Sequence, residues 1–284
     1  MNNMLLRAMT GTVYVALIVC SIIFGGGWGF PALCCLFAIL ATIEFSHLCT
    51  SQGSSPSAII VTDTIGALII AASPALILHA AGNPAASAFN IGALMLGAFT
   101  ACLLARLTMQ LYIRSVSPLV SWTASLGGLL YIAFPLSLAS LVYLISGPGI
   151  ILTMFIMIWL NDTGAYLVGS RIGRRRLFER ISPKKSWEGF FGGMAFCIIA
   201  AIVIKCCMGS YTPGMSLWAM VVYAIVVCVC ATWGDLVESL IKRTLGVKDS
   251  GRMMPGHGGI LDRIDSLLFV APATLCFIVI LMYI

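Results

Sequence analysis

Apolar side chains fill nine long runs of the chain, and short stretches rich in Gly, Pro, Ser and Asn separate them. Most runs are about 20 residues long, the length of helix that crosses a bilayer. The sequence therefore predicts an all-α, polytopic integral membrane protein with about nine transmembrane helices, near residues 8–25, 30–48, 58–80, 88–106, 119–145, 150–168, 188–207, 216–240 and 262–284. The fifth run is overlong and contains Gly127, Gly128 and Pro135, so a break or strong tilt is expected there.

The overall composition supports this assignment. Hydrophobic residues make up 60% of the 284 residues, charged residues only 9%, and the mean hydropathy is +1.05. Soluble domains are roughly half apolar. We therefore expect no soluble domain, but an amino-terminal region of about five spans (1–145) and a carboxy-terminal region of about four (146–284), which holds two polar loops, 169–187 and 241–261.

Basic residues orient the predicted spans. With nine crossings, fifteen of the sixteen Lys and Arg residues fall on one side, and Lys205 alone falls near the other. Loops rich in Lys and Arg remain in the cytoplasm. The distribution predicts a cytoplasmic amino terminus, cytoplasmic polar loops and a carboxy terminus on the opposite side.

One polar stretch, residues 235–265, holds five of the ten acidic residues of the chain: Asp235, Glu238, Asp249, Asp262 and Asp265. The spacing of three within each of two pairs, Asp235 with Glu238 and Asp262 with Asp265, puts both members on one helical face. A helix cannot continue through Pro255-Gly256, so two helices joined by a loop are expected. Facing carboxylate pairs suit Mg²⁺, whereas salt bridges at a membrane surface are the alternative.

For this metal, Asp235 and Asp262 are predicted as direct ligands, supported by Glu238 and Asp265. Magnesium takes one or two protein carboxylates directly and fills its other positions with water and phosphate oxygens. The number of metal ions stays open, and a second ion is compatible with four acids.

A second polar stretch, residues 159–189, interrupts the sixth predicted span. Asn161 and Asp162 lie within the span, which costs a few kcal/mol unless they are paired or hydrated. The arginines that follow are interpreted as an anchor on anionic headgroups. Lys184 and Lys185 precede a predicted helix, where the helix dipole opposes them unless an anion such as phosphate binds there.

Two acids belong to the early spans. Glu44 lies at the cytoplasmic end of the second span and Asp63 lies inside the third. An acid within a membrane marks a functional site by default. For Asp63, however, an interior water or a hydroxyl such as Thr62 or Thr64 is the favoured partner.

Both polar stretches resemble the phosphatidate cytidylyltransferases, also called CDP-diacylglycerol synthases. The matching segments are NDT-AY, ISPKKSWEG, SLIKR, KDSG and PGHGGILDRID, within residues 159–265. One departure is Met254, where the family pattern has Leu, Ile or Phe, and methionine is an apolar substitute of similar bulk. The amino-terminal half is similar only in being a row of spans.

The resemblance implies that phosphatidic acid attacks the α-phosphorus of CTP and gives CDP-diacylglycerol and pyrophosphate. The attacking phosphate monoester has a second pKa of about 6 and is largely ionised at neutral pH, so no activated serine or cysteine is needed. Residues expected in catalysis are Asp235, Asp262, Lys184, Lys242 and Arg243. Residues expected to bind substrate are Asn161, Asp162, Ser182, Lys185, Ser239, Lys248, Asp249, His257, Gly258, Gly259 and Arg263.

The expected partners are CTP, phosphatidic acid and the lipid bilayer, but not nucleic acid, and a homodimer is left open. The expected location is the inner (cytoplasmic) membrane of a bacterium, with the active site facing the cytoplasm. The alternative is a polytopic secondary transporter for an anionic substrate. A transporter would hold its charges near the midplane in paired halves, whereas this chain gathers them at one interface.

Overall fold

The computed structural model describes residues 3–49, 56–82, 87–114, 117–209, 212, 214–251 and 258–283. Its elements are α1 (Asn3–Ile23), α2 (Gly29–Cys49), α3 (Ser57–Ala81), α4 (Ala88–Met109), α5 (Pro118–Gly128), the π-helical turn η1 (Leu129–Ala133), α6 (Phe134–Ser146), α7 (Pro148–Ile172), β1 (Arg176–Phe178), β2 (Ser182–Ser186), α8 (Trp187–Met208), α9 (Leu217–Thr244) and α10 (Leu261–Tyr283). The all-α class is confirmed.

The number of spans also fits the expectation of about nine. Eight helical segments of the described residues are long and apolar enough to cross a membrane, with α5, η1 and α6 counted as one. The apolar part of α1 described with side chains, Met9–Ile23, is shorter. The helices α7 and α9 extend beyond the predicted spans, so that Lys242 and Arg243 lie on the last turn of α9.

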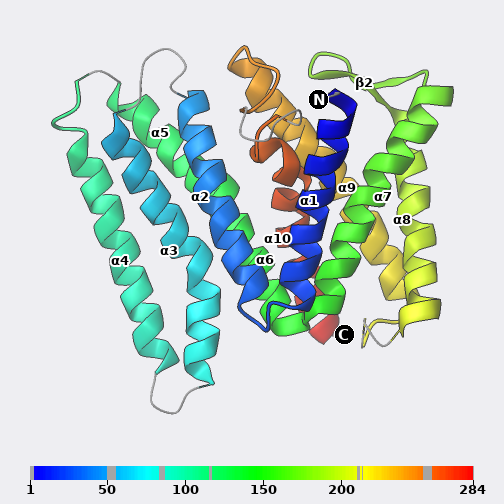
Figure 1. Cartoon of the computed structure of the whole chain (residues 1–284), viewed down its shortest axis with the longest axis horizontal. Helices are drawn as coiled ribbons and strands as arrows, with labels where there is room; N and C mark the ends of the chain where they lie inside the picture. The colour runs from blue at the N-terminus through cyan, green and yellow to red at the C-terminus, as the bar shows by residue number, and fades with distance from the viewer. Residues whose placement is uncertain are drawn as a thin grey trace. The chain divides into compact units, whose positions relative to one another are not determined.

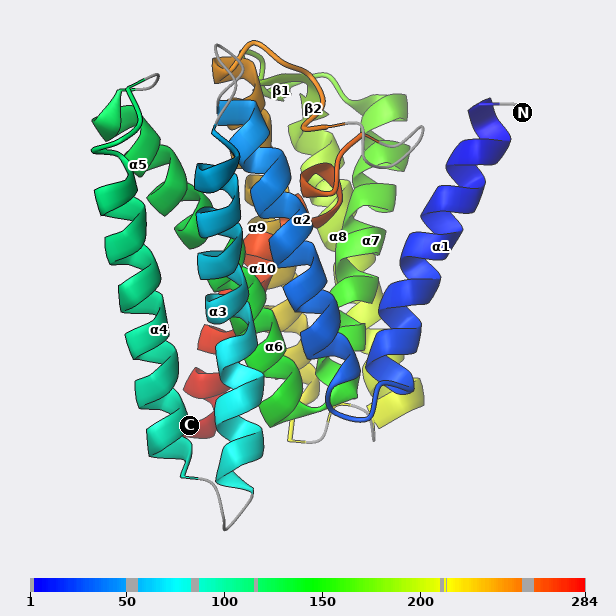
Figure 2. The same cartoon turned by 60° about the vertical axis from the view of Figure 1, so that its left-hand side comes forward.

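The chain divides into two compact units. The first comprises residues 1–144 together with 249–262, and the second comprises 145–248 together with 263–284. In the first unit, α3 lies between α2 and α4 (Figures 1 and 2). The predicted break in the fifth span is a π-helical turn in which the Phe134 N–H bonds to Leu129 O, five residues back. Helical structure thus continues through Pro135, which has no N–H to donate, as far as Ser146.

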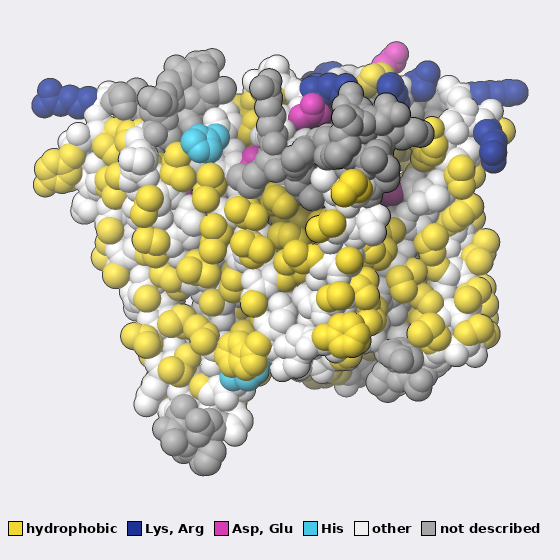
Figure 3. All heavy atoms as spheres, viewed as in Figure 1, with side chains coloured by type: hydrophobic (Ala, Val, Ile, Leu, Met, Phe, Trp, Pro, Cys, Tyr) yellow, Lys and Arg dark blue, Asp and Glu magenta, His cyan; other side chains and the backbone are white. Residues whose placement is uncertain are grey.

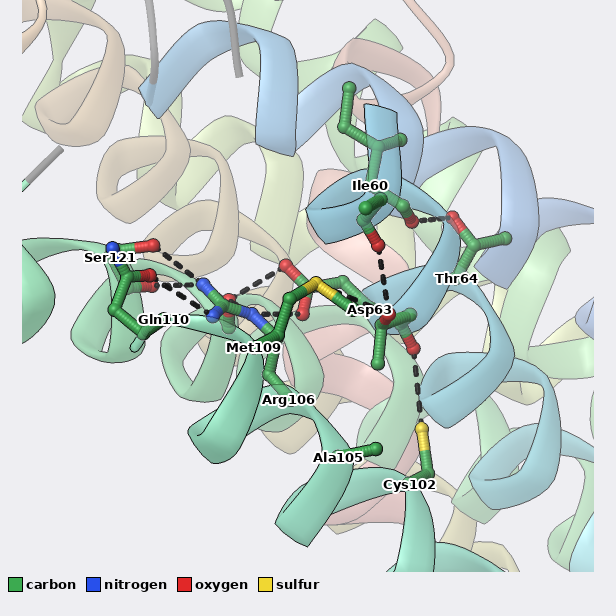
Figure 4. Close-up of polar contacts among 12 residues, drawn as sticks. Ile60, Asp63, Thr64, Cys102, Ala105, Arg106, Met109, Gln110 and Ser121 are labelled. Atoms are coloured by element: carbon green, nitrogen blue, oxygen red, sulfur yellow. Dashed lines mark hydrogen bonds and ion pairs between the residues drawn. The ribbon is translucent and has the colours of Figure 1, made fainter. Parts of the chain in front are cut away.

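Asp63 of α3 has a hydroxyl partner, as expected, but the hydroxyl belongs to Ser125, and Arg106 is a second partner that was not expected. Its Oδ1 lies 3.2 Å from Arg106 Nε of α4, and its Oδ2 accepts a 2.7 Å hydrogen bond from Ser125 Oγ of α5. Thr62 and Thr64 instead donate to backbone carbonyls of their own helix. Arg106 also reaches Gln110 and Ser121 (Figure 4). The ion pair is buried and joins three helices.

In the second unit, α7, α8 and α9 pack against one another, and the antiparallel hairpin β1–β2 joins α7 to α8. Glycines of α8 allow the close approach of α7. A Cβ on Gly189 would lie 2.9 Å from Ala165 O, and one on Gly193 would lie 2.5 Å from Asn161 Oδ1. These distances are too short for a side chain, so the two glycines set the spacing of the helices.

Candidate functional site

A cavity of about 560 Å³ opens in the second unit between α7, the β1–β2 hairpin, α8 and α9. Charged and polar side chains in its wall come from all of these elements except α8: Asn161, Asp162, Arg176, Lys184, Lys185 and Asp235. Lys and Arg side chains gather at the hairpin end of α7 and α8, whose sides carry mainly hydrophobic side chains (Figure 3). The cavity therefore combines acids with a basic rim.

Three carboxylates form a cluster, and one of them, Asp235, also lines this cavity. One oxygen of each of Asp235, Glu238 and Asp265 lies within 4.8 Å of the others. Asp235 and Glu238 share a face of α9, as their spacing predicts. Asp265 comes from α10, which approaches α9 where Gly234 lacks a side chain, since a Cβ there would lie 2.7 Å from Asp265 O.

Two lysines balance part of this negative charge. Lys185 Nζ lies 2.5 Å from Asp235 Oδ2, and Lys242 Nζ lies 2.5 Å from Glu238 Oε2. Asp162 of α7 is close enough to interact electrostatically with both Asp235 and Lys185. Like charges this close repel one another unless a cation compensates them.

The donor set of the cluster fits a hard cation. Carboxylate oxygens are the ligands that Mg²⁺ takes, together with water and substrate phosphates. Ser239 Oγ donates to Asp235 Oδ1 over 3.3 Å and so orients that carboxylate. The residues that could hold a metal ion in the second unit are therefore Asp235, Glu238 and Asp265.

Asp262 has a distinct set of contacts in the first unit. Its Oδ2 accepts hydrogen bonds from the backbone N–H groups of Ser250 (3.0 Å) and Gly259 (2.8 Å). Gly258 has φ +82°, and a Cβ there would lie 2.5 Å from Asp262 Oδ2. Asp262 thus closes the loop that precedes α10, whereas its assignment as a metal ligand stays a prediction.

The hairpin β1–β2 carries the basic side of the cavity. Lys184 and Lys185 lie on strand β2 and not in the first turn of α8, which Ser186 caps by accepting from the Gly189 N–H. Glu188 accepts hydrogen bonds from the backbone N–H groups of Arg174 and Arg175, at 3.0 and 3.2 Å. The two lysines thus lie on a strand of a hairpin that the Glu188 hydrogen bonds stabilise. Because they lie outside α8, the unfavourable interaction with its helix dipole that was expected does not apply to them directly.

Asn161 is 2% exposed at the inner wall of the cavity. Its Nδ2 lies 3.5 Å from Thr232 Oγ1, and within the described part of the chain its Oδ1 has no hydrogen-bond partner. A buried polar atom without a partner costs about 1–3 kcal/mol. The oxygen lies against Gly193 of α8, where the absence of a side chain leaves room for it.

The other predicted residues have varied surroundings. Lys242 pairs with Glu238, and Arg243 Nη1 donates to Val247 O (3.0 Å), where it stabilises the end of α9. Lys248, Asp249 and Arg263 are exposed, Ser182 begins β2, and Gly259 packs against Glu44. His257 lies outside the described residues.

Sequence reasoning missed several residues of the cavity. Arg176, assigned to the membrane anchor, lines the cavity, as do Tyr166, Phe190 and Thr232. Arg176 pairs with Ser186 in the hairpin, which brings it beside the lysines, and the short strands of that hairpin carry no periodic pattern that could have predicted this. Tyr166, Phe190 and Thr232 lie within long apolar runs and likewise carry no sequence signal of a site.

The sequence pattern of the cytidylyltransferase family matches residues 5–281. Proteins named phosphatidate cytidylyltransferase are similar over a shorter stretch: one from Staphylococcus epidermidis is 48% identical over 122 residues, one from Staphylococcus saprophyticus 47% over 122, and one from Staphylococcus aureus 46% over 123. Each similarity covers 43% of this chain and 46% of the relative, so the chain spans about half the length of these relatives.

Proposed function

The chain belongs to the cytidylyltransferase family, and from this we propose that it transfers the cytidylyl group of CTP to phosphatidic acid, releasing pyrophosphate and forming CDP-diacylglycerol. The observation that carries the proposal is the cavity of the second unit, where Lys184, Lys185 and Arg176 lie beside Asp162 and Asp235. The basic side chains of this wall can bind the phosphates of CTP and of phosphatidic acid, two polyanions that the reaction must hold together. The name of the staphylococcal relatives supports the choice of phosphatidate.

The chain's own residues act mainly by positioning and charge. A phosphate oxygen of phosphatidic acid bonds to the α-phosphorus of CTP, the bond from that phosphorus to the bridging β-oxygen breaks, and pyrophosphate leaves with the electron pair. Lys184 and Arg176 bind phosphate oxygens at the rim. Lys185 exchanges its contact with Asp235 for a phosphate, and Asn161 forms part of the inner wall against which the nucleotide binds.

We assign a magnesium site to the three clustered carboxylates, Asp235, Glu238 and Asp265. When bound, Mg²⁺ would neutralise phosphate oxygens and make the α-phosphorus easier to attack. Asp162 would orient water or substrate beside the ion. The polar loops are proposed to face the cytoplasm, because fifteen of the sixteen basic residues fall on the side that the positive-inside rule assigns to it.

A single assay tests the proposal. The full chain, purified in detergent, is incubated with labelled CTP and phosphatidic acid, with and without Mg²⁺. The expected result is labelled lipid and an equal amount of pyrophosphate, both dependent on the metal and on phosphatidic acid. Counterflow of an anion in proteoliposomes without any labelled lipid would support a transporter and reject the proposal.

A further inference from the structure

We propose that Glu44, on α2, is a positioning residue that holds the two described ends of the loop before α10, residues 249–251 and 258–262, in the positions needed for transfer. This inference rests on the proposed function, because the loop contains the segments KDSG and PGHGGILD, which resemble the cytidylyltransferase family. Glu44 lies about 200 residues before the loop in the sequence, and both belong to the first unit. The residues beside Glu44 in the sequence give no indication of such a role.

The contacts of Glu44 are directed at both ends of the loop. Its carboxylate is buried, with 4% of the residue exposed. Oε1 accepts from the Ser250 hydroxyl and from the Leu261 N–H (3.4 Å), and Oε2 accepts from the Ile260 N–H (2.8 Å). One side chain thus joins the first residues of the loop to the residues that begin α10.

Two glycines at the ends of the loop allow the close approach of this carboxylate. A Cβ on Gly251 would lie 2.8 Å from Glu44 Cδ, and one on Gly259 would overlap Oε1. Asp262 also contacts both ends of the loop, by accepting from the backbone N–H groups of Ser250 and Gly259. Glu44 and Asp262 therefore fix the two ends of the loop together.

A carboxylate suits this position for electrostatic reasons. The first N–H groups of a helix have no partner within the helix and carry partial positive charge, so an anion stabilises them. Ile260 and Leu261 supply these groups for α10. Several donors also offset the cost of burying the charge of Glu44. An amide in its place would have one acceptor oxygen instead of two.

Loop position matters because the proposed reaction depends on alignment. A displacement of about 1 Å in a group that positions substrate can reduce the rate about 100-fold. Release of the loop would move Asp249 and Asp262 without removing them. The loss should fall on kcat more than on KM, because correct alignment is required in the transition state.

Two variants and a matched control test the role of Glu44. Glu44→Met removes both acceptors at similar volume, and Glu44→Gln keeps one. Asp63→Asn changes the other buried acid of the same unit, whose partners are Arg106 and Ser125 rather than the loop. For each, kcat, KM, thermal unfolding and the rate of trypsin cleavage after the exposed Lys248 are measured on the full chain in detergent.

We expect Glu44→Met to lower kcat about 100-fold, Glu44→Gln to recover part of that loss, and both to accelerate cleavage after Lys248. Asp63→Asn should lower the unfolding temperature with kcat per folded molecule retained. Unchanged kcat and cleavage in Glu44→Met, or equal kcat losses in Glu44→Met and Asp63→Asn, would overturn the inference. If the wild type makes no CDP-diacylglycerol, the proposed function fails, and the cleavage rates still decide whether Glu44 holds the loop.

Discussion

The two compact units use their carboxylates in different ways. In the first unit, Glu44 and Asp63 are buried and each is surrounded by donors, backbone N–H groups and a hydroxyl for Glu44, Arg106 and a hydroxyl for Asp63. In the second unit, Asp235, Glu238 and Asp265 lie within 4.8 Å of one another beside a cavity. The first arrangement satisfies its charges internally, and the second concentrates like charge.

This difference separates positions that hold structure from positions that bind ligands. A buried acid with a full set of donors contributes to a defined packing, because removal of one partner leaves an uncompensated charge. A cluster of acids raises the energy of the protein unless a cation compensates it, and Lys185 and Lys242 supply part of that charge. The cluster is therefore the place where a metal ion or substrate should alter stability.

The strongest test of this comparison is Asp235→Asn. The substitution removes one charge from the cluster and keeps the volume, so turnover should fall about 1,000-fold, as when a group that stabilises developing charge is lost, while the unfolding temperature in the absence of metal stays the same or rises. Turnover with saturating CTP and thermal unfolding with and without Mg²⁺ are measured. Glu179→Gln, an exposed acid between β1 and β2, is the control and should behave as the wild type. Near-normal turnover of Asp235→Asn would remove the second unit's cluster from the site.

In the first unit, loss of a charged side chain should lower stability and leave turnover unchanged, the opposite of the effect expected for Asp235→Asn. Arg106→Ala leaves Asp63 buried without its ion pair and removes the contacts to Gln110 and Ser121 (Figure 4). Breaking a buried pair in this way costs about 3–5 kcal/mol. We expect a large drop in unfolding temperature and an unchanged turnover per folded molecule. A variant as stable as the wild type but inactive would place Arg106 in the chemistry.

The fold was largely predictable from the sequence because a bilayer restricts the choices. Apolar runs of about 20 residues have few alternatives to a transmembrane helix, and the helices follow them closely. The hairpin β1–β2 was missed, since two strands of three and five residues produce no periodic pattern. The π-helical turn at Leu129–Ala133 likewise depends on hydrogen bonding that spacing does not reveal.

The sequence predicted which types of residue form the candidate site better than it predicted which of these residues lie together. Spacing placed Asp235 beside Glu238, because both lie on one helix. Asp262 and Asp265 do lie three residues apart on α10, but their contacts differ, because Asp265 lies with the α9 acids and Asp262 accepts from loop N–H groups. The role of Glu44 rests on contacts with residues more than 200 positions away, and a single sequence carries no trace of such contacts.

The smallest expected effect concerns the basic rim of the second unit, where Lys184 and Arg175 provide a matched pair. Lys184 lines the cavity, so Lys184→Ala should raise the KM for CTP about 10-fold, equivalent to roughly 1.4 kcal/mol of binding energy. Arg175 contributes its backbone N–H to Glu188, and alanine retains that group, so Arg175→Ala should change KM less than about twofold.

Salt concentration sharpens this last distinction. Since Lys184 is exposed, its attraction for phosphate is screened as ionic strength rises, with a Debye length of about 10 Å at 0.1 M and about 3 Å at 1 M. The KM difference between Lys184→Ala and the wild type should therefore shrink as salt is added, while Arg175→Ala follows the wild type throughout. Steady-state kinetics at several salt concentrations measure both. An Arg175→Ala defect equal to that of Lys184→Ala would mean that phosphate recognition extends over the whole arginine run, and the division between cavity and membrane anchor would have to move.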